Sequence, residues 1–329
     1  MHFIIIPKKL SHGDKIAVIA PARSMSILSE TTRQYAISSL ESIGLKVEAS
    51  MHSEEADEFL SSSVKSRIED LEWAFSSKEI KGVLTVIGGF NSNEMLDYID
   101  FDFIRKNPKP LCGYSDITTL NNSIFAKTGL VTYYGPHFST FGMLKGNEYT
   151  IDYFKKCVMS EGSYEIIQSK EWSDDTWYKD QENRKFIRNE GYKAVNFGSA
   201  EGTILGGNLC TFNLLQGTKY MPDLKDSILF FEDDDKSNPV SFARDLQSVI
   251  HQPGFDEVKG MVIGRFQNKS GMTDSLLRKI IKTKRELEDI PVISDVDFGH
   301  TTPMATFPIG GTAKISAEAG SVSITIKEH

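Results

Sequence analysis

The sequence predicts an α/β protein whose first half is organised on a parallel sheet. Two apolar segments, residues 14–22 and 82–87, have the length and composition of buried strands. Apolar residues recur at helical spacing in segments 31–44 and 61–75, which alternate with these strands. Strands and helices that alternate in this way favour a parallel sheet with right-handed crossovers, whose ligand site lies beyond the carboxyl ends of the strands.

The rest of the chain extends this pattern. In the first half, we expect a short strand at 45–48, a short helix at 91–98 and a strand at 110–112. The second half should contain strands at 200–205, 226–231, 260–265 and 291–294, a glycine turn at 206–207, helices at 208–216, 241–251 and 274–287, and an antiparallel pair at 313–315 and 322–326. We divide the chain into an α/β part (1–165), a connecting loop (166–190) and a β-rich part (191–329).

The composition is that of an ordinary globular protein. The chain has 329 residues, of which 40% are hydrophobic and 25% charged, and this length is sufficient for two packed domains. The net charge of −8 comes without a long basic run, which argues against a nucleic acid polymer as partner. The three cysteines, Cys112, Cys157 and Cys210, form no Cys-x-x-Cys pair, so we expect buried thiols in a reducing compartment rather than disulfides or zinc.

The first ten residues do not resemble a secretory signal. Their apolar run is only four residues long, and the lysines follow it instead of preceding it. No apolar segment approaches the ~20 residues that a membrane span needs. The predicted location is therefore the cytoplasm, without a membrane partner.

Ser115 is the candidate nucleophile. The prolines at 108 and 110 block a helix before it, and segment 116–125 has the composition of a helix after it, so Ser115 should lie between a strand and a helix. The free N–H groups of a helix start can stabilise an oxyanion beside such a serine. The alternative is that Ser115 only caps the helix.

Gly88 and Gly89 end the predicted strand 82–87. They lack the G-x-G-x-x-G spacing of a dinucleotide site, so we do not assign them a phosphate. A flexible turn at this position can instead bring a backbone N–H close to Ser115 as a second oxyanion donor.

A serine nucleophile needs a base, and the base needs an orienting carboxylate. His300 directly follows Gly299 and His137 comes two residues after Gly135, so spacing favours His300 only slightly. Glu232 is the preferred carboxylate because it stands at the last apolar position of its strand, before Asp233 to Asp235. The acidic cluster could also bind a divalent metal, but it lacks the calcium-loop pattern.

The polar loop at 171–177 contains two tryptophans, Trp172 and Trp177. One interpretation is that they pin the loop onto the protein. The other is that one of them stacks on a planar part of a ligand, since binding residues concentrate on loops.

Several motifs together resemble the LD-carboxypeptidase family of serine peptidases. They are Gly113-Tyr114-Ser115-Asp116, Leu205-Gly206-Gly207-Asn208-Leu209, Phe231-Glu232-Asp233, Phe298-Gly299-His300 and the opening segment 13–21. The resemblance implies an N-terminal flavodoxin-like domain and a C-terminal β-rich domain, and it extends over nearly the whole chain. An α/β-hydrolase would instead need G-x-S-x-G, and Ile117 stands where its last glycine should be.

The resemblance also implies roles. Ser115 would attack the scissile carbonyl, His300 would act as general base and then acid, and Glu232 would orient His300. The backbone N–H groups of Gly89 and Asp116 would form the oxyanion hole. No metal or cofactor is implied, and the family suggests a homodimer.

Two branches of the family differ in substrate. One releases D-alanine from cell-wall tetrapeptides, and the microcin C self-immunity branch cleaves peptidyl or aminoacyl conjugates of a modified nucleotide. The loop at 171–192 resembles the second branch, in which an aromatic residue stacks on the nucleobase; we prefer Trp172 slightly to Trp177 for this role, and expect Asn208 to contact substrate. A binding protein without catalysis is the alternative from another class.

Overall fold

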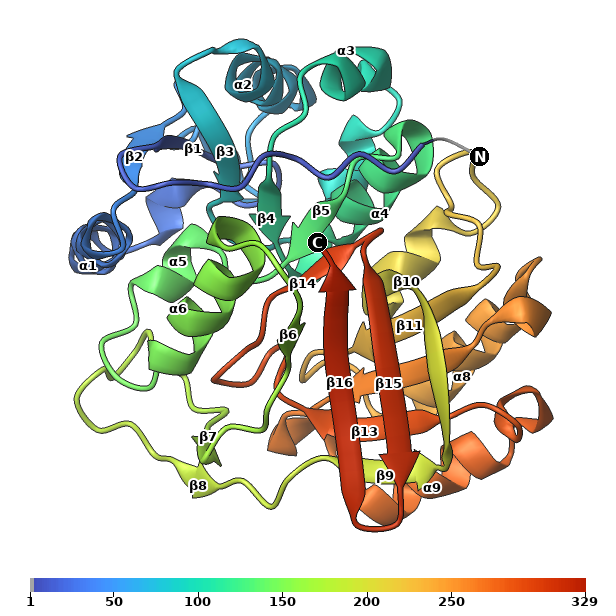
Figure 1. The fold of residues 1–329 in the computed structure, drawn as a ribbon. Helices are drawn as coiled ribbons and strands as arrows, with labels where there is room; N and C mark the ends of the chain where they lie inside the picture. Colours follow the sequence, from blue (N-terminus) through green and yellow to red (C-terminus); the bar gives the residue numbers. More distant parts are fainter. Residues whose placement is uncertain (1–2) are drawn as a thin grey trace.

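The computed structural model describes residues 3–329 and contains two large sheets, which Figure 1 shows next to each other. The first sheet has the strand order β14-β5-β4-β3-β1-β2, and β1 to β5 run parallel in the 2-1-3-4-5 order of flavodoxin-like folds. Its strands are β1 (Lys15–Ile19), β2 (Lys46–Ala49), β3 (Ile80–Thr85), β4 (Leu111–Gly113), β5 (Thr132–Tyr134) and β14 (Phe307–Ile309).

Serine caps begin the two longest helices of this half. Ser29 accepts a hydrogen bond from the N–H of Thr32 at α1, and Ser63 accepts one from the N–H of Ser66 at α2. The helices are α1 (Glu30–Ser42), α2 (Val64–Ser76), α3 (Phe101–Lys106), α4 (Thr118–Thr128), α5 (Phe138–Phe141) and α6 (Glu148–Phe154). The helix predicted at 91–98 is wrong in type, because only a 3-10 turn forms at Ser92–Met95, and α3 follows it.

The second sheet has eight strands in the order β6-β16-β15-β10-β11-β12-β13-β9. Its centre, β10 to β13, is parallel, and antiparallel strands flank it on both sides. The strands are β6 (Tyr164–Glu165), β9 (Lys193–Asn196), β10 (Gly198–Asn208), β11 (Ser227–Glu232), β12 (Gly260–Gly264), β13 (Val292–Val296), β15 (Thr312–Glu318) and β16 (Ser321–Glu328). The expected α/β fold, with a parallel N-terminal sheet and a β-rich second part, is confirmed.

Three helices accompany the second sheet: α7 (Leu209–Phe212), α8 (Pro239–Ile250) and α9 (Asp274–Lys282). The predicted glycine turn at 206–207 is wrong. Gly206 and Gly207 stay within β10, with φ angles of 117° and 124°. A Cβ on Gly207 would lie 2.6 Å from the Thr118 hydroxyl of α4, so the missing side chain allows β10 to approach the first half of the protein.

The two halves exchange strands at their boundary. β14 comes from the end of the chain but pairs antiparallel with β5 of the first sheet. β6 precedes the connecting loop and pairs with β16 of the second sheet. A separate two-stranded ribbon, β7 (Glu171–Trp172) with β8 (Ile187–Arg188), lies within the loop. These exchanges fix the first sheet against the second, so that strand ends from both can meet.

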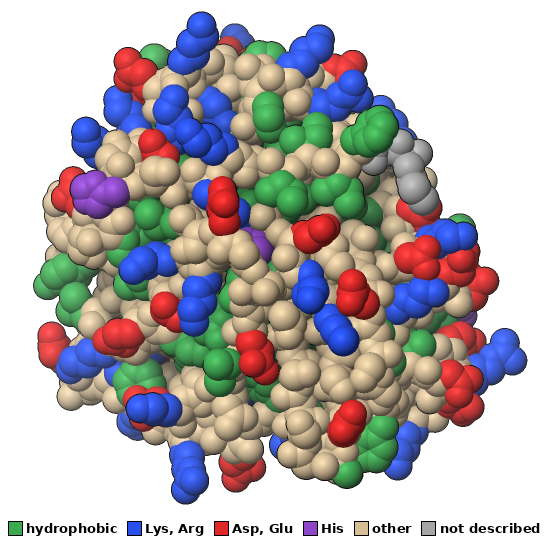
Figure 2. All heavy atoms as spheres, viewed as in Figure 1, with side chains coloured by type: hydrophobic (Ala, Val, Ile, Leu, Met, Phe, Trp, Pro, Cys, Tyr) green, Lys and Arg blue, Asp and Glu red, His purple; other side chains and the backbone are tan. Residues whose placement is uncertain are grey.

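The surface shows mixed charge. Figure 2 shows Lys and Arg side chains interspersed with Asp and Glu over one face, with no continuous basic surface there. Within residues 3–329, no helix is long and apolar enough to cross a membrane. Cys112 and Cys157 are buried free thiols, but the expectation of burial is wrong for Cys210, which is exposed.

Candidate functional site

Three strand ends bring Ser115, Glu232 and His300 together. Ser115 follows β4, Glu232 ends β11, and His300 follows β13. The Ser115 hydroxyl lies 3.0 Å from Nε2 of His300, and Nδ1 of the same ring lies 2.7 Å from the Glu232 carboxylate. Because an ionised carboxylate only accepts, Nδ1–H of His300 donates to Glu232 and Nε2 is left to accept from the serine.

Ser115 has a φ angle of 59°, in the left-handed region that non-glycine residues rarely adopt. Neighbouring glycines make this sharp turn possible. A Cβ on Gly113 would lie 2.3 Å from the Thr85 hydroxyl, and one on Gly88 would lie 3.0 Å from Cβ of Ser115. A strained serine between a strand and a helical turn has the geometry of a nucleophile elbow.

Glu232 is fully buried, and its carboxylate is held from several sides. The Tyr134 hydroxyl donates to Oε1 over 2.7 Å, and Nδ2 of Asn208 donates to the same oxygen over 3.2 Å. Gly299, with φ of 101°, packs so closely that its Cβ would lie 2.5 Å from Oε2. The glycine before His300 therefore makes room for the carboxylate that binds the imidazole.

Electrostatics couple the buried acid to the histidine. Burial opposes ionisation of Glu232, but His300 and the hydrogen bonds from Tyr134 and Asn208 outweigh it and lower the pKa of the carboxyl. Burial also opposes a charged His300, yet the Glu232 carboxylate outweighs this effect and raises the pKa of the imidazole. The pair therefore favours a carboxylate that stabilises an imidazolium.

Gly89 and Asp116 were predicted to supply the oxyanion donors from their backbones. The carboxylate of Asp116 faces away from this task, since it accepts the N–H of Ser92 over 2.9 Å. The backbone N–H of Asp116 lies in the first helical turn after β4, directly after the serine. Gly88, the neighbour of Gly89, contacts the Ser115 side chain closely, so the glycine turn does lie against the serine.

His137, the other candidate base, has a different environment. It is buried, its Nδ1 lies 2.8 Å from the Thr85 hydroxyl, and its ring packs on Tyr114 at 4.2 Å between centroids. Burial and then the nearby His300 lower the pKa of His137 well below its ordinary value. No hydrogen bond joins it to Ser115 within the described residues, so the geometry favours His300 as the partner of the serine.

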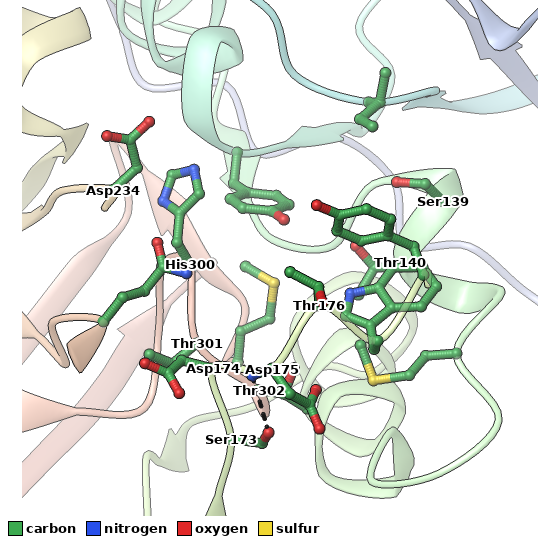
Figure 3. A pocket seen from close by; sticks show the side chains of 18 of the residues that line it. Ser139, Thr140, Ser173, Asp174, Asp175, Thr176, Asp234, His300, Thr301 and Thr302 are labelled. Carbon is green, nitrogen blue, oxygen red and sulfur yellow. Dashed lines mark hydrogen bonds between the residues drawn. The ribbon is translucent and has the colours of Figure 1, made fainter. Parts of the chain in front are cut away.

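A cavity of about 580 Å³ opens at His300. Figure 3 shows His300 and Asp234 on one side of it, Ser139 and Thr140 on the other, and Thr176 between them. The residues that line it come from both halves and from the connecting loop; they include Arg23, Tyr114, Met143, Asp174, Asp175, Trp177, Tyr178, Gln267 and Met304.

The connecting loop is anchored to both halves. Ser173 and Thr302 exchange two backbone hydrogen bonds of 2.7 Å, which tie the loop to the segment after His300. On the other side, Nε2 of Gln181 donates to the carbonyl of Gly142 over 2.8 Å. This double attachment holds residues 173–178 over the cavity.

The two tryptophans lie in different places. Trp177 lines the cavity and packs edge-on against Tyr178 at 6.0 Å. Trp172 does not line it; its ring lies over the Arg265 guanidinium, which pairs with Asp297. Of the two tryptophans, Trp177 therefore faces the cavity, although the sequence slightly favoured Trp172 for the stacking role.

Asn208 also differs from expectation. It is almost completely buried and does not line the cavity; it contacts Glu232 and Asp233 and caps α7. Sequence reasoning missed Tyr134, whose hydroxyl contacts both the Glu232 carboxylate and, at 3.4 Å, the backbone N–H of Ser115. The sequence carries no separate signal for this role of Tyr134, which depends on β5 lying next to β4 in the sheet.

The comparisons with known proteins show the family. Residues 16–135 match the LD-carboxypeptidase N-terminal domain, and residues 201–315 match the LD-carboxypeptidase C-terminal domain. The chain belongs to the LD-carboxypeptidase family. It is therefore a serine-type peptidase hydrolase, as the motifs predicted.

Relatives from this family cover nearly the whole chain. YocD of Bacillus subtilis, provisionally named a carboxypeptidase, is 52% identical over 98% of this chain and 99% of its own length. The Escherichia coli microcin C7 self-immunity protein MccF is 27% identical over 98% and 96%. A B. subtilis protein provisionally named a murein peptide carboxypeptidase is 30% identical over 94% and 91%.

Solved structures give the same result. An MccF-like protein from Bacillus anthracis has a TM-score of 0.98 at 52% identity and covers 99% of this chain and 100% of its own. MccF in complex with aspartyl sulfamoyl adenosine has a TM-score of 0.89 at 27% identity and covers 99% of each. Members of the LD-carboxypeptidase family thus include both murein carboxypeptidases and immunity proteins.

Proposed function

We propose that this member of the family hydrolyses peptidyl or aminoacyl conjugates of a modified nucleotide, as in microcin C detoxification. The observation that carries the proposal is the hydrogen-bonded line from Glu232 through His300 to Ser115, beside a cavity that also contains Trp177. MccF, which binds aspartyl sulfamoyl adenosine, shares the fold over the whole chain and supports a nucleotide conjugate as ligand.

The chemistry follows from the three side chains. Oγ of Ser115 bonds to the scissile carbonyl carbon while its proton passes to Nε2 of His300. Glu232 stabilises the imidazolium, which then protonates the leaving nitrogen as the amide or phosphoramidate-linked C–N bond breaks. A water molecule then attacks the acyl carbon and gives its proton to Nε2 of His300, which returns a proton to Oγ of Ser115 as the ester C–O bond breaks and the acid is released. The N–H groups of Gly89 and Asp116 would stabilise the oxyanion in both steps.

Trp177 supplies the nucleotide specificity in this proposal. Its indole offers an aromatic face within the cavity, held there by a loop that is anchored on both sides. Stacking of a base on an aromatic side chain contributes about 1–3 kcal/mol. Such a contact would account for tryptophan in a loop that is otherwise polar.

The proposal is tested with an aminoacyl-sulfamoyl adenosine and with an L,D-linked cell-wall tetrapeptide. We expect hydrolysis of the nucleotide conjugate, a loss of roughly a thousandfold or more in Ser115→Ala, and a KM raised about tenfold in Trp177→Ala. Trp172→Ala is the matched control, since Trp172 lies outside the cavity. Failure of the wild-type enzyme to cleave the conjugate, or turnover that survives Ser115→Ala, would refute the proposal.

The second candidate function is release of D-alanine from a cell-wall tetrapeptide. The 30% identity to the B. subtilis murein peptide carboxypeptidase favours it. Cleavage of the tetrapeptide that neither tryptophan substitution diminishes would select this function. A homodimer in the cytoplasm, acting without metal or organic cofactor, stays a prediction for either function.

A further inference from the structure

Besides His300, the cavity beside Ser115 contains one basic side chain among the described residues that line it. Among the described residues that line it, Arg23 is the only lysine or arginine, and four acids line the same cavity: Asp174, Asp175, Asp234 and Asp235. A single cation in a pocket with several acids is expected to pair with one of them.

Two of these four acids form ion pairs elsewhere. Asp175 pairs with Arg184 at 2.7 Å, and Asp235 pairs with Lys269 at 2.6 Å. Within residues 3–329, no carboxylate lies within 4.0 Å of the Arg23 guanidinium. Arg23 therefore makes no ion pair within the described part of the chain.

The inner end of the Arg23 side chain also lacks a partner. Nε of Arg23 is buried and makes no hydrogen bond within the described part of the chain. Nε of Arg67 and Nε of Arg265 also lack partners, but a terminal nitrogen of each of these arginines pairs with Glu94 or Asp297, at 2.6 and 3.2 Å. Arg23 differs from these two arginines because no carboxylate pairs with it, so its guanidinium is available to an acceptor from outside the chain.

The position of Arg23 in the fold connects it to the reacting centre. It follows β1, and the Gly88-Gly89 turn follows β3, so both lie at the point where the strand order reverses, which is where ligands bind in open α/β sheets. The N–H of Arg23 donates to the carbonyl of Gly88 over 3.3 Å. A Cβ on Gly88 would in turn lie 3.1 Å from the Ser115 hydroxyl. Gly88 therefore lies between the backbone of Arg23 and the hydroxyl of Ser115.

We propose that Arg23 binds the anionic group next to the scissile bond and so decides that this hydrolase acts on chain ends. In a peptide this group is the free α-carboxylate, which lies one residue beyond the scissile carbonyl; in a nucleotide conjugate it is the phosphate. Both present a pair of anionic oxygens that a guanidinium can bind through two hydrogen bonds. This inference rests on the proposed role of Ser115 as nucleophile.

Binding to the full-length Ser115→Ala protein tests Arg23 without turnover. Calorimetry would compare four probes: an L,D-linked tetrapeptide with a free carboxylate, the same peptide as a carboxamide, adenosine monophosphate and adenosine. We expect Arg23→Gln to weaken binding of at least one anion about 10- to 100-fold, and to change binding of its neutral counterpart less than twofold. Arg23→Lys should recover part of the loss.

Arg105→Gln is the matched control, because Arg105 is exposed in α3 and outside the cavity. A thermal melt of each variant verifies that it folds. Selective loss for the peptide carboxylate or for the nucleotide phosphate supports the inference and tells which anion Arg23 binds. Equal losses for anion and neutral probe, or no loss for either anion, would overturn it. Because no probe is cleaved, this result is independent of whether the wild-type enzyme hydrolyses the nucleotide conjugate.

Discussion

The two halves of this protein prepare their parts of the site by different physical means. The first half presents Ser115 through backbone geometry, with a φ angle of 59° and glycines packed closely around it. The second half presents Glu232 and His300 through burial and charge, which move the two pKa values in opposite directions. The comparison teaches that one site can combine a strained backbone from the first half of the protein with shifted pKa values from the second half.

The comparison predicts that Glu232→Gln changes both the rate and its pH dependence. We expect kcat/KM to fall about 100- to 1000-fold, since the imidazolium loses its counter-ion. His300 must be neutral to accept the serine proton, and Glu232 raises its pKa, so activity of the wild type falls as pH decreases through a value above 6.5. Without the carboxylate, burial dominates, and this acid limb should move to lower pH. An unmoved limb in a pH profile of kcat/KM would contradict the electrostatic account.

The electrostatics of the second half should also affect the free energy of unfolding, through Asp233. Burial and the neighbouring Glu232 raise the pKa of Asp233 to about 7, so ionising it in the folded state costs free energy. This cost is absent below the pKa that Asp233 has in the unfolded chain, near 4, and it grows as the pH rises towards the pKa of Asp233 in the folded protein. We expect Asp233→Asn to stabilise the protein by about 2 kcal/mol at pH 9 and by little at pH 4. Urea unfolding at the two pH values measures this; a gain that is equal at both would argue against it.

Gly88→Ala tests whether close backbone packing in the first half positions Ser115. The new Cβ would lie 3.0 Å from Cβ of Ser115, so the serine must move by a few tenths of an ångström. We expect kcat to fall about tenfold, because small displacements of a nucleophile are costly. The acid limb of the pH profile should stay in place, since the Glu232 and His300 pair is untouched. A shift in the acid limb would show that the packing around Ser115 and the pKa of His300 are not independent.

The smallest expected effect is a difference in stability between Ser115→Gly and Ser115→Ala. Both remove the nucleophile, but only glycine accepts a φ angle of 59° without strain. We expect the glycine variant to unfold with a free energy about 1 kcal/mol higher than that of the alanine variant. This difference should not depend on pH, in contrast to that of Asp233→Asn. Equal stabilities in chemical denaturation would mean that the turn at Ser115 carries no strain.

The sequence was most informative where local signals agree with the fold. Apolar runs separated by amphipathic helices predicted β1, β3 and β4, and the prolines before Ser115 predicted its turn, because these features depend on neighbours in the chain. Trp172 and Trp177 could not be separated in this way. The sequence around both is equally compatible with pinning the loop and with facing a ligand. Only the packing of Trp172 against Arg265 distinguishes them.

Other features depend on residues that are distant in the chain. β14 joins the first sheet only because it pairs with β5, more than 170 positions earlier. Tyr134 is an ordinary aromatic residue of a buried strand until Glu232 is placed opposite its hydroxyl. Gly206 and Gly207 read as a turn until the approach of α4 explains why a strand needs them.

The sequence by itself therefore determined the family, the parallel sheet and the three residue types of the site, since strand periodicity, turn chemistry and short motifs are properties of contiguous segments. Only the tertiary structure decided which tryptophan faces the cavity, that Arg23 stands there unpaired, and how Glu232 and His300 tune each other's pKa. Burial and unpaired charge are relations between segments, and they exist only once the two sheets have packed together.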